Sequence, residues 1–257
     1  MHVELSFPLH GTSLMVDHGY SLFSAVAEHV SKLHPSNRTA PPPRPHMSED
    51  PWDHVAILPI GGRVTGVRQL LLTAQSRLTL RLAPKLIPEL LPLAGRELRI
   101  RGDRVRLGVP NVRALTSESA LYARLVTIKG YMTAEPFLEA VKEQLAEIAI
   151  SGTPRLVPRQ AQQVVAVGEH AEERAFTSET TTAPVAAGTE LHRPPADPYI
   201  RRTIRIRKAE VVGYALLVEG LSVEDSLRLQ QYGLGGRRRM GCGVFVPART
   251  EATHESA

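Results

Sequence analysis

The order of strand-like and helix-like segments constrains the fold of this chain most strongly, because the same order occurs twice. In the first half, apolar residues alternate at 3–9, and Leu22, Val26 and Leu33 then recur at helical spacing within 21–34. Two strand-like segments, a short helix and a pair of strands are predicted next, at 54–64, 68–83, 84–95 and 97–108. This half therefore has the order strand, helix, strands, helix, strands.

The second half repeats that order. A strand is predicted at 123–131, and the helix after it has an apolar stripe from Phe137 to Ile148. A hairpin, a helix that begins after the N-cap residue Ser222, and a last strand follow at 203–221, 222–233 and 243–247. Strand-helix-strand-strand-helix-strand is the ferredoxin-like pattern, whose open sheet face binds RNA in RNA-recognition modules. The sequence thus predicts an α+β protein with two tandem ferredoxin-like domains and a C-terminal glycine-rich loop.

The predicted domains are residues 1–116 and 120–250, followed by a tail at 251–257. Each domain contains one segment that we interpret as an insertion. The segment at about 35–51 is rich in proline, and the one at about 151–197 is rich in Thr, Ala, Pro and Gln without a sustained period. We expect the first to be a loop or a disordered insertion and most of the second to be flexible.

Charge and cysteine content restrict the classes of function. The formal net charge of +5 and the pI near 9.6 favour an anionic partner, although an excess of arginine also arises from a GC-rich genome. Cys242 is the only cysteine, which excludes an internal disulfide and a cysteine-based zinc site and fits the cytoplasm. We see no signal peptide, no apolar run long enough to span a membrane, and no pattern of metal ligands. We therefore expect no membrane association, no metal and no small-molecule cofactor.

The segment GLGGRRRMGCGVF, residues 233–245, combines glycines with three consecutive arginines. It is not a dinucleotide-binding fingerprint, because the third glycine is missing and the segment follows a helix instead of a strand. It is not a phosphate-binding Walker A loop, because Lys and Ser or Thr do not follow its last glycine. Two interpretations remain: a helix cap with a loop, or a cradle whose N–H and guanidinium groups bind RNA phosphates. The cradle would consist of Gly233, Gly235, Gly236, Arg237, Arg238, Arg239, Gly241 and Gly243.

This ending, placed after the last helix of a second ferredoxin-like domain, resembles the signature glycine-rich loop of the RAMP superfamily. Within it the chain is most similar to the Myxococcus-type subgroup of CRISPR-associated endoribonucleases, with DHGYSLFSAV, VAILPIGG and LVTIKGY as supporting segments. The resemblance spans most of the chain apart from the two insertions. It implies metal-independent cleavage of CRISPR precursor RNA within the repeats, in which a 2′-OH attacks the adjacent phosphate and leaves a 2′,3′-cyclic phosphate and a 5′-OH. It also implies CRISPR repeat RNA and other subunits of a type I effector complex as partners.

The resemblance also indicates catalytic residues. Many members have a histidine near the end of the first helix and an aromatic residue near its start, and His34 and Tyr20 occupy these positions. We expect His34 to act as general base or acid, with His18 as the alternative and Tyr20 as a residue that orients the base or the ribose. Some relatives have a lysine shortly after the catalytic histidine, but Pro35 follows here and Arg38 is the nearest cation. Arginines of the glycine-rich segment would then have to stabilise the transition state.

Three further basic residues are candidates for RNA contact. Arg205 and Arg207 lie on one face of the predicted hairpin, although alternating arginines also suit a solvated sheet face. Lys129 lies at the end of the first strand of the second domain. Two other functions stay open: a RAMP protein that holds CRISPR RNA without cutting it, and a general RNA-recognition protein. The first shares the loop but needs no catalytic histidine, and an aromatic content of 5% counts against the second.

Overall fold

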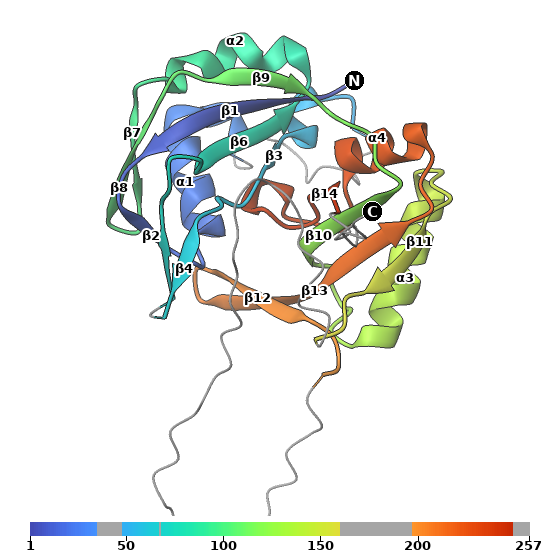
Figure 1. Cartoon of the computed structure of the whole chain (residues 1–257). Helices are drawn as coiled ribbons and strands as arrows, with labels where there is room; N and C mark the ends of the chain where they lie inside the picture. The colour runs from blue at the N-terminus through green and yellow to red at the C-terminus, as the bar shows by residue number, and fades with distance from the viewer. Residues whose placement is uncertain (35–47, 67, 160–196, 249–257) are drawn as a thin grey trace, which may run out of the picture.

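The described part of the chain forms three β-sheets, and the two larger ones lie on either side of the segment between the last helix and the last strand (Figure 1). The computed structural model describes residues 1–34, 48–66, 68–159 and 197–248. The chain passes from the first sheet to the second between Ala114 and Ala120. This segment, residues 233–245, contains the glycine-rich loop and contacts both halves of the molecule.

The first sheet has the order β3-β6-β1-β8-β7, and β9 also pairs with β1. Its strands are β1 (Val3–His10), β3 (Ala56–Ile57), β6 (Arg77–Leu82), β7 (Glu97–Ile100), β8 (Asp103–Leu107) and β9 (Asn111–Ala114). The antiparallel register of β1 and β6 sets Leu5 opposite Leu80 and Phe7 opposite Leu78, and all four side chains are buried. The alternation seen in the sequence thus supplies the core face of this sheet.

Helices of the first domain pack into the same core. α1 (Gly19–His29) buries Leu22, Phe23 and Val26, and the short 3-10 helix η1 (Ser31–Leu33) follows it. The single helix predicted at 84–95 is instead three short turns, η5 (Pro84–Leu86), α2 (Ile87–Leu90) and η6 (Leu91–Leu93). Each turn has a proline in its first residues, and proline removes a backbone donor that a continuous helix would need.

A small three-stranded sheet extends the first domain, with the order β2-β5-β4. Its strands are β2 (Ser13–Met15), β4 (Arg63–Thr65) and β5 (Gln69–Leu71). The sequence had indicated longer strands at 54–64 and 68–83. β3 and β4 belong to different sheets. Between them the chain passes Gly62, where a Cβ atom would collide with the carbonyl oxygen of Leu71.

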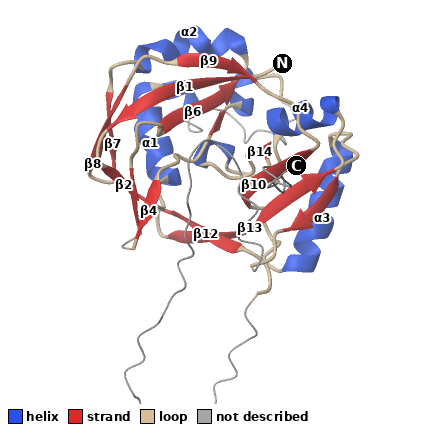
Figure 2. Cartoon of the chain, in the orientation of Figure 1, coloured by secondary structure: helices blue, strands red, loops and turns tan. Residues whose placement is uncertain are grey.

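The second sheet has the order β11-β13-β10-β14, and β12 also pairs with β13. Its strands are β10 (Ala120–Val126), β11 (Thr153–Leu156), β12 (Arg201–Ile206), β13 (Ala209–Glu219) and β14 (Val246–Pro247). Figure 2 shows α3 (Ala134–Glu147) and α4 (Val223–Tyr232) beside these strands. The order β3-β6-β1-β8 of the first sheet is the same arrangement of the strand-helix-strand-strand-helix-strand unit. The prediction of two tandem ferredoxin-like domains is confirmed.

The segments interpreted as insertions are only partly described. Residues 35–47 and 160–196 lie outside the described part of the chain, and so does the predicted tail at 251–257. The stretch that begins at 151 nevertheless contains β11, an edge strand of four residues with a proline, which has too little alternation to be recognised in the sequence. The proline-rich stretch ends in the 3-10 helix η4 (Pro51–His54), which Asp50 caps by accepting a hydrogen bond from the backbone of Trp52.

Arg81 of β6 connects the two domains. Its side chain is completely buried, and its guanidinium donates to Glu4 Oε1 at 2.6 Å, to Gln230 O at 3.0 Å and to Phe245 O at 2.6 Å. Burial lowers the pKa of Arg81, while the carboxylate of Glu4 opposes that shift and favours the charged form. Because Gln230 and Phe245 belong to the second domain, this buried guanidinium fixes how the two domains are placed.

None of the described helices is both long enough and apolar enough to cross a bilayer.

Candidate functional site

The glycine-rich loop, defined here as residues 233–243, is a compact backbone structure. α4 ends at Gly233, whose φ of 64° is a left-handed conformation that favours glycine. A Cβ atom at Gly233 would collide with the carbonyl oxygen of Gly243, so the two ends of the loop touch through their backbones. Gly236 N donates to Thr127 O at 3.0 Å and Gly243 N to Leu125 O at 2.7 Å, which fastens the loop to β10. The glycines therefore allow close backbone contact within the protein.

The centre of the glycine-rich loop is the 3-10 helix η7 (Arg238–Met240). Both flanking residues, Arg237 and Gly241, are left-handed, with φ of 65° and 82°. The backbone N–H groups of Met240 and Cys242 both donate to Arg237 O, at 2.8 and 3.3 Å. A non-glycine residue with positive φ is uncommon and persists where its surroundings over-determine it. η7 is thus held in one orientation, and this orientation sends the three arginines in different directions.

Arg237 and Arg238 have opposite environments. Arg237 is half-buried, lines a pocket, and its Nη1 lies 3.5 Å from Thr127 Oγ1. Arg238 is 4% exposed, and its guanidinium donates to His54 O at 3.2 Å and Gln230 O at 3.5 Å. Burial, with the nearby charge of Arg81, lowers the pKa of Arg238. Of these two side chains, Arg237 is accessible at the pocket, whereas the burial of Arg238 between the domains argues against its predicted place in an RNA cradle.

Arg239 points toward the first domain. Its Nη1 donates to Leu33 O at 2.6 Å, and its Nη2 donates to Trp52 O at 2.8 Å and lies 3.4 Å from Asp53 Oδ1. The Arg239 side chain is 15% exposed. Leu33 directly precedes His34, so the second domain reaches the backbone that carries the predicted catalytic histidine. The glycine-rich loop and His34, about 200 residues apart in sequence, are thereby brought together.

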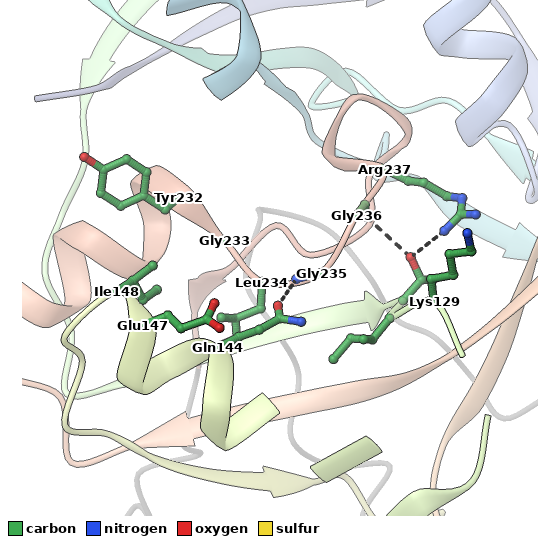
Figure 3. A pocket seen from close by; sticks show the side chains of 12 residues that line it. Lys129, Gln144, Glu147, Ile148, Tyr232, Gly233, Leu234, Gly235, Gly236 and Arg237 are labelled. Carbon is green, nitrogen blue, oxygen red and sulfur yellow. Dashed lines mark hydrogen bonds between the residues drawn. The ribbon is translucent and has the colours of Figure 1, made fainter. Parts of the chain in front are cut away.

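The pocket beside the glycine-rich loop has a volume of about 210 Å³ (Figure 3). The residues that follow β10, the end of α3, the last residue of α4 and the loop itself supply its lining, which is Thr127, Ile128, Lys129, Gln144, Glu147, Ile148, Tyr232, Gly233, Leu234, Gly235, Gly236 and Arg237. Gln144 Oε1 accepts a hydrogen bond from Gly235 N at 2.7 Å, which turns the donor end of the amide away from the loop. The charged ends of Lys129 and Arg237 lie together at one side. Two cations placed side by side repel each other and attract an anion such as a phosphate.

Tyr20 meets the second domain at the other end of the site. Gly19, at the start of α1, lies so close to η7 that a Cβ atom there would be 2.5 Å from Met240 O. The hydroxyl of Tyr20 accepts a hydrogen bond from Arg207 Nε at 3.3 Å, and this bond lowers the pKa of Tyr20. Arg207 lies in the turn between β12 and β13, whereas Arg205 is exposed and pairs with Glu210 at 2.9 Å.

The two candidate histidines differ in access. His34 is exposed, follows η1, and places its ring 6.2 Å from that of Phe23 on α1. His18 is 2% exposed: Ile60 N donates to its Nε2 at 3.1 Å, so its Nδ1 carries the hydrogen and donates to Met15 O at 2.9 Å. Burial lowers the pKa of His18 and keeps the ring neutral. His18 therefore holds the start of α1 in place, and His34 is the histidine that a substrate can reach.

Several residues near the site were missed by the sequence analysis. Gln144 and Tyr232 line the pocket, and a row of rings crosses the domain boundary, with the buried His2 against His54 and His54 against the half-buried Tyr232. Their sequence context is ordinary amphipathic helix or strand, so no local signal sets them apart. Among the described residues, no three histidine, cysteine or carboxylate side chains are grouped as they would be to hold a metal ion.

Comparisons with known proteins test the predicted family and fold. The sequence profile of a family described as Cas6, "Cas6 Crispr", matches residues 3–250. A curated relative, the "CRISPR-associated endonuclease Cas6" of Myxococcus xanthus (strain DK1622), is 31% identical over 254 residues, which cover 99% of this chain and 85% of the relative. The predicted resemblance to the Myxococcus-type subgroup is therefore confirmed.

Two solved structures share the fold at low identity. One is a "CRISPR associated protein Cas6", with a TM-score of 0.54, 11% identity, and coverage of 96% of this chain and 98% of that chain. The other comes from a "Cas6-related gene from Pyrococcus furiosus", with a TM-score of 0.55, 12% identity, and coverage of 98% and 99%. At such identities the likeness supports the two-domain fold alone.

Proposed function

Because the chain belongs to the Cas6 family, we propose that it is the endoribonuclease that cleaves CRISPR precursor RNA within the repeats and yields mature guide RNA. The observation that carries this proposal is the contact between Arg239 and Leu33 O, which joins the glycine-rich loop of the second domain to the segment of His34. This contact supports a site in which an RNA strand that lies against the loop meets the exposed imidazole of His34. In the cell we place this activity in the cytoplasm, with other subunits of a type I effector complex as partners.

The proposed reaction needs no metal. The ribose 2′-oxygen loses its proton to a general base and attacks the adjacent phosphorus, and the bond from phosphorus to the 5′-oxygen breaks. The leaving 5′-oxygen takes up a proton, and the products are a 2′,3′-cyclic phosphate and a 5′-hydroxyl. We assign one of these proton transfers to His34, because its imidazole is exposed beside the segment that Arg239 of the glycine-rich loop contacts, and imidazole can both accept and donate a proton. Tyr20, paired with Arg207, is our candidate for orienting the ribose or the base.

Fewer cationic side chains are available to contact the RNA phosphates than the sequence indicated. Arg237 and Lys129 at the pocket, and Arg207 at the hairpin turn, remain accessible. We propose that the RNA backbone passes Lys129 and Arg237, with one nucleotide at the pocket, whose volume of about 210 Å³ suits a group of nucleobase size. Arg207 is not part of that pocket lining and is proposed to contact the strand near Tyr20.

Cleavage of the repeat RNA of the same genome tests this proposal. The protein is incubated in EDTA with that RNA and with a matched RNA that carries 2′-deoxyribose at the scissile position. We expect cleavage of the first RNA only. Cleavage of the deoxy substrate, or a strict requirement for added magnesium, would reject the mechanism.

A pair of histidine variants separates an enzyme from a binding subunit. His34→Ala should abolish cleavage and leave RNA affinity within about threefold, since the truncation removes a proton carrier and no phosphate contact. The matched control is His29→Ala, at an exposed position of α1. Tight binding without cleavage by the unmodified protein would instead support the alternative of a RAMP subunit that holds the RNA and does not cut it.

A further inference from the structure

Arg239 makes contacts that an RNA-binding arginine does not need. Its guanidinium reaches two backbone carbonyls of the first domain, Leu33 O at 2.6 Å and Trp52 O at 2.8 Å, and lies 3.4 Å from the carboxylate of Asp53. The side chains of Arg239 and Asp53 are 15% and 7% exposed. A planar guanidinium has five donors in a fixed fork, and here the fork is directed into the protein. Arg239 therefore differs from Arg237, which lines the open pocket.

The two carbonyls that Arg239 binds belong to different segments. Leu33 ends η1, immediately before His34, and Trp52 lies in η4. One side chain from the second domain thus ties together two segments of the first domain, one of which ends immediately before the predicted catalytic histidine. The contact with Asp53 adds a charge-assisted interaction, which is stronger than a neutral hydrogen bond.

The same three-residue helix also holds the start of α1. A Cβ atom at residue 19 would lie only 2.5 Å from Met240 O, so Gly19 packs directly on the backbone of η7. η7 consequently contacts α1 next to Tyr20 and, through Arg239, the backbone next to His34. Arg237, the N-cap residue of η7, lines the pocket. A rigid element of five residues therefore connects the pocket with both proposed catalytic side chains.

We propose that Arg239 is a positioning residue, which places His34 relative to RNA bound at the glycine-rich loop and contacts no RNA itself. This inference rests on the proposed function, because it needs His34 as the proton carrier. The imidazole and the phosphate-binding groups come from different domains, so their separation is set by contacts between the domains and not by local chain geometry. Arg239 makes such a contact, because its guanidinium binds the carbonyl oxygen of Leu33, the residue adjacent to His34. A displacement of about 1 Å between reacting groups costs up to about 100-fold in rate.

Arg239→Gln and Arg239→Lys test this role, with Arg237→Gln as the contrasting variant and Arg99→Gln, on the exposed face of β7, as the neutral control. Affinity is measured with 2′-deoxy RNA at several salt concentrations, and the cleavage rate in single turnovers at saturating enzyme. For Arg239→Gln we expect a rate about 10- to 100-fold lower, with affinity within about threefold and an unchanged salt slope. Arg239→Lys should recover only part of the rate, because an ammonium group cannot bind two carbonyls as a fork does.

Arg237→Gln should behave in the opposite way. Its affinity should fall, and the slope of log affinity against log salt should become shallower by about 0.7 for the loss of one phosphate contact on a single strand. If Arg239→Gln shows this pattern, Arg239 binds RNA and the inference is wrong. A saturated rate equal to that of the unmodified protein would overturn it as well.

Two further measurements separate positioning from loss of folding. Histidine NMR signals should move for His34 in Arg239→Gln and stay in place for the exposed His29, whereas global unfolding moves both. If Arg239→Gln does not fold, Asp53→Asn takes its place, because it weakens the contact between Arg239 and Asp53. The cleavage rate of a folded Asp53→Asn protein should be severalfold lower at equal RNA affinity. An unchanged rate in that variant counts against the inference. An active His34→Ala protein would instead refute the proposed catalytic residue, whatever Arg239 does.

Discussion

Replacing His2 by phenylalanine is expected to make the stability of the protein less sensitive to acid. His2 is 4% exposed, and its ring meets that of His54 edge to face, with 6.0 Å between ring centroids. Burial lowers the pKa of His2 from 6.5 to about 4, and the positive charge of Arg238 acts in the same direction. The side chain of Gln231 favours the charged ring, but the effect of burial is larger. The folded protein therefore keeps this ring neutral, while the unfolded chain takes up a proton.

The size of the effect follows from proton linkage. The unfolded state binds more protons than the folded state between pH 6.5 and about pH 4, so the free energy of unfolding is largest above pH 6.5 and falls as the pH is lowered through this window. A difference of about 2.5 pKa units corresponds to about 3 kcal/mol in total, of which about 2 kcal/mol is lost between about pH 7 and about pH 5. His2→Phe removes the titrating group and keeps an aromatic ring in the same space.

Equilibrium unfolding in urea at about pH 7 and about pH 5 measures this loss. Trp52, the only tryptophan and 6% exposed, reports the transition by fluorescence. The unmodified protein should lose about 2 kcal/mol more than His2→Phe between the two pH values, and His29→Phe, at an exposed position, should lose as much as the unmodified protein. Equal losses for His2→Phe and the unmodified protein would show that His2 is not held neutral at the domain boundary, and the reasoning from its burial would be refuted.

Arg81→Ala should lower the free energy of unfolding, measured in urea, by about 3–5 kcal/mol, because one carboxylate and two carbonyls lose a buried donor. A loss below about 1 kcal/mol would contradict the role of Arg81 in connecting the domains. Gly19→Ala should lower the saturated cleavage rate by about tenfold, because the new Cβ atom would lie 2.5 Å from a carbonyl oxygen of η7. The control Gly66→Ala, whose Cβ atom would have nothing within 4 Å, should leave the rate unchanged. Equal rates for the two variants would show that α1 need not touch η7. Arg207→Gln should raise the pKa of Tyr20 toward its ordinary value in a spectroscopic titration, and an unchanged pKa would mean that this hydrogen bond does not form in solution.

Local patterns in the sequence were sufficient for the fold class. Alternation placed β1, and helical spacing placed α1 and α3, because burial of one face depends on neighbours a few residues away. Ser222 caps α4 as predicted, accepting a hydrogen bond from Asp225 N at 3.1 Å. Short elements were less predictable: β11 has four residues, and the prolines at 84–92 divide what was expected to be one helix.

The sequence by itself determined which residues could serve the site, namely a histidine near the end of the predicted first helix and a loop rich in glycine and arginine. Only the tertiary structure decided that Arg238 is buried, that Arg239 binds the backbone beside His34, and that Arg81 lies between the domains. In β6, Arg81 follows Leu80 and would lie on a solvated face if the first sheet stood alone. Whether a charged side chain meets water, RNA or a carbonyl depends on the segment that packs over it, and in each of these cases that segment comes from the other half of the chain.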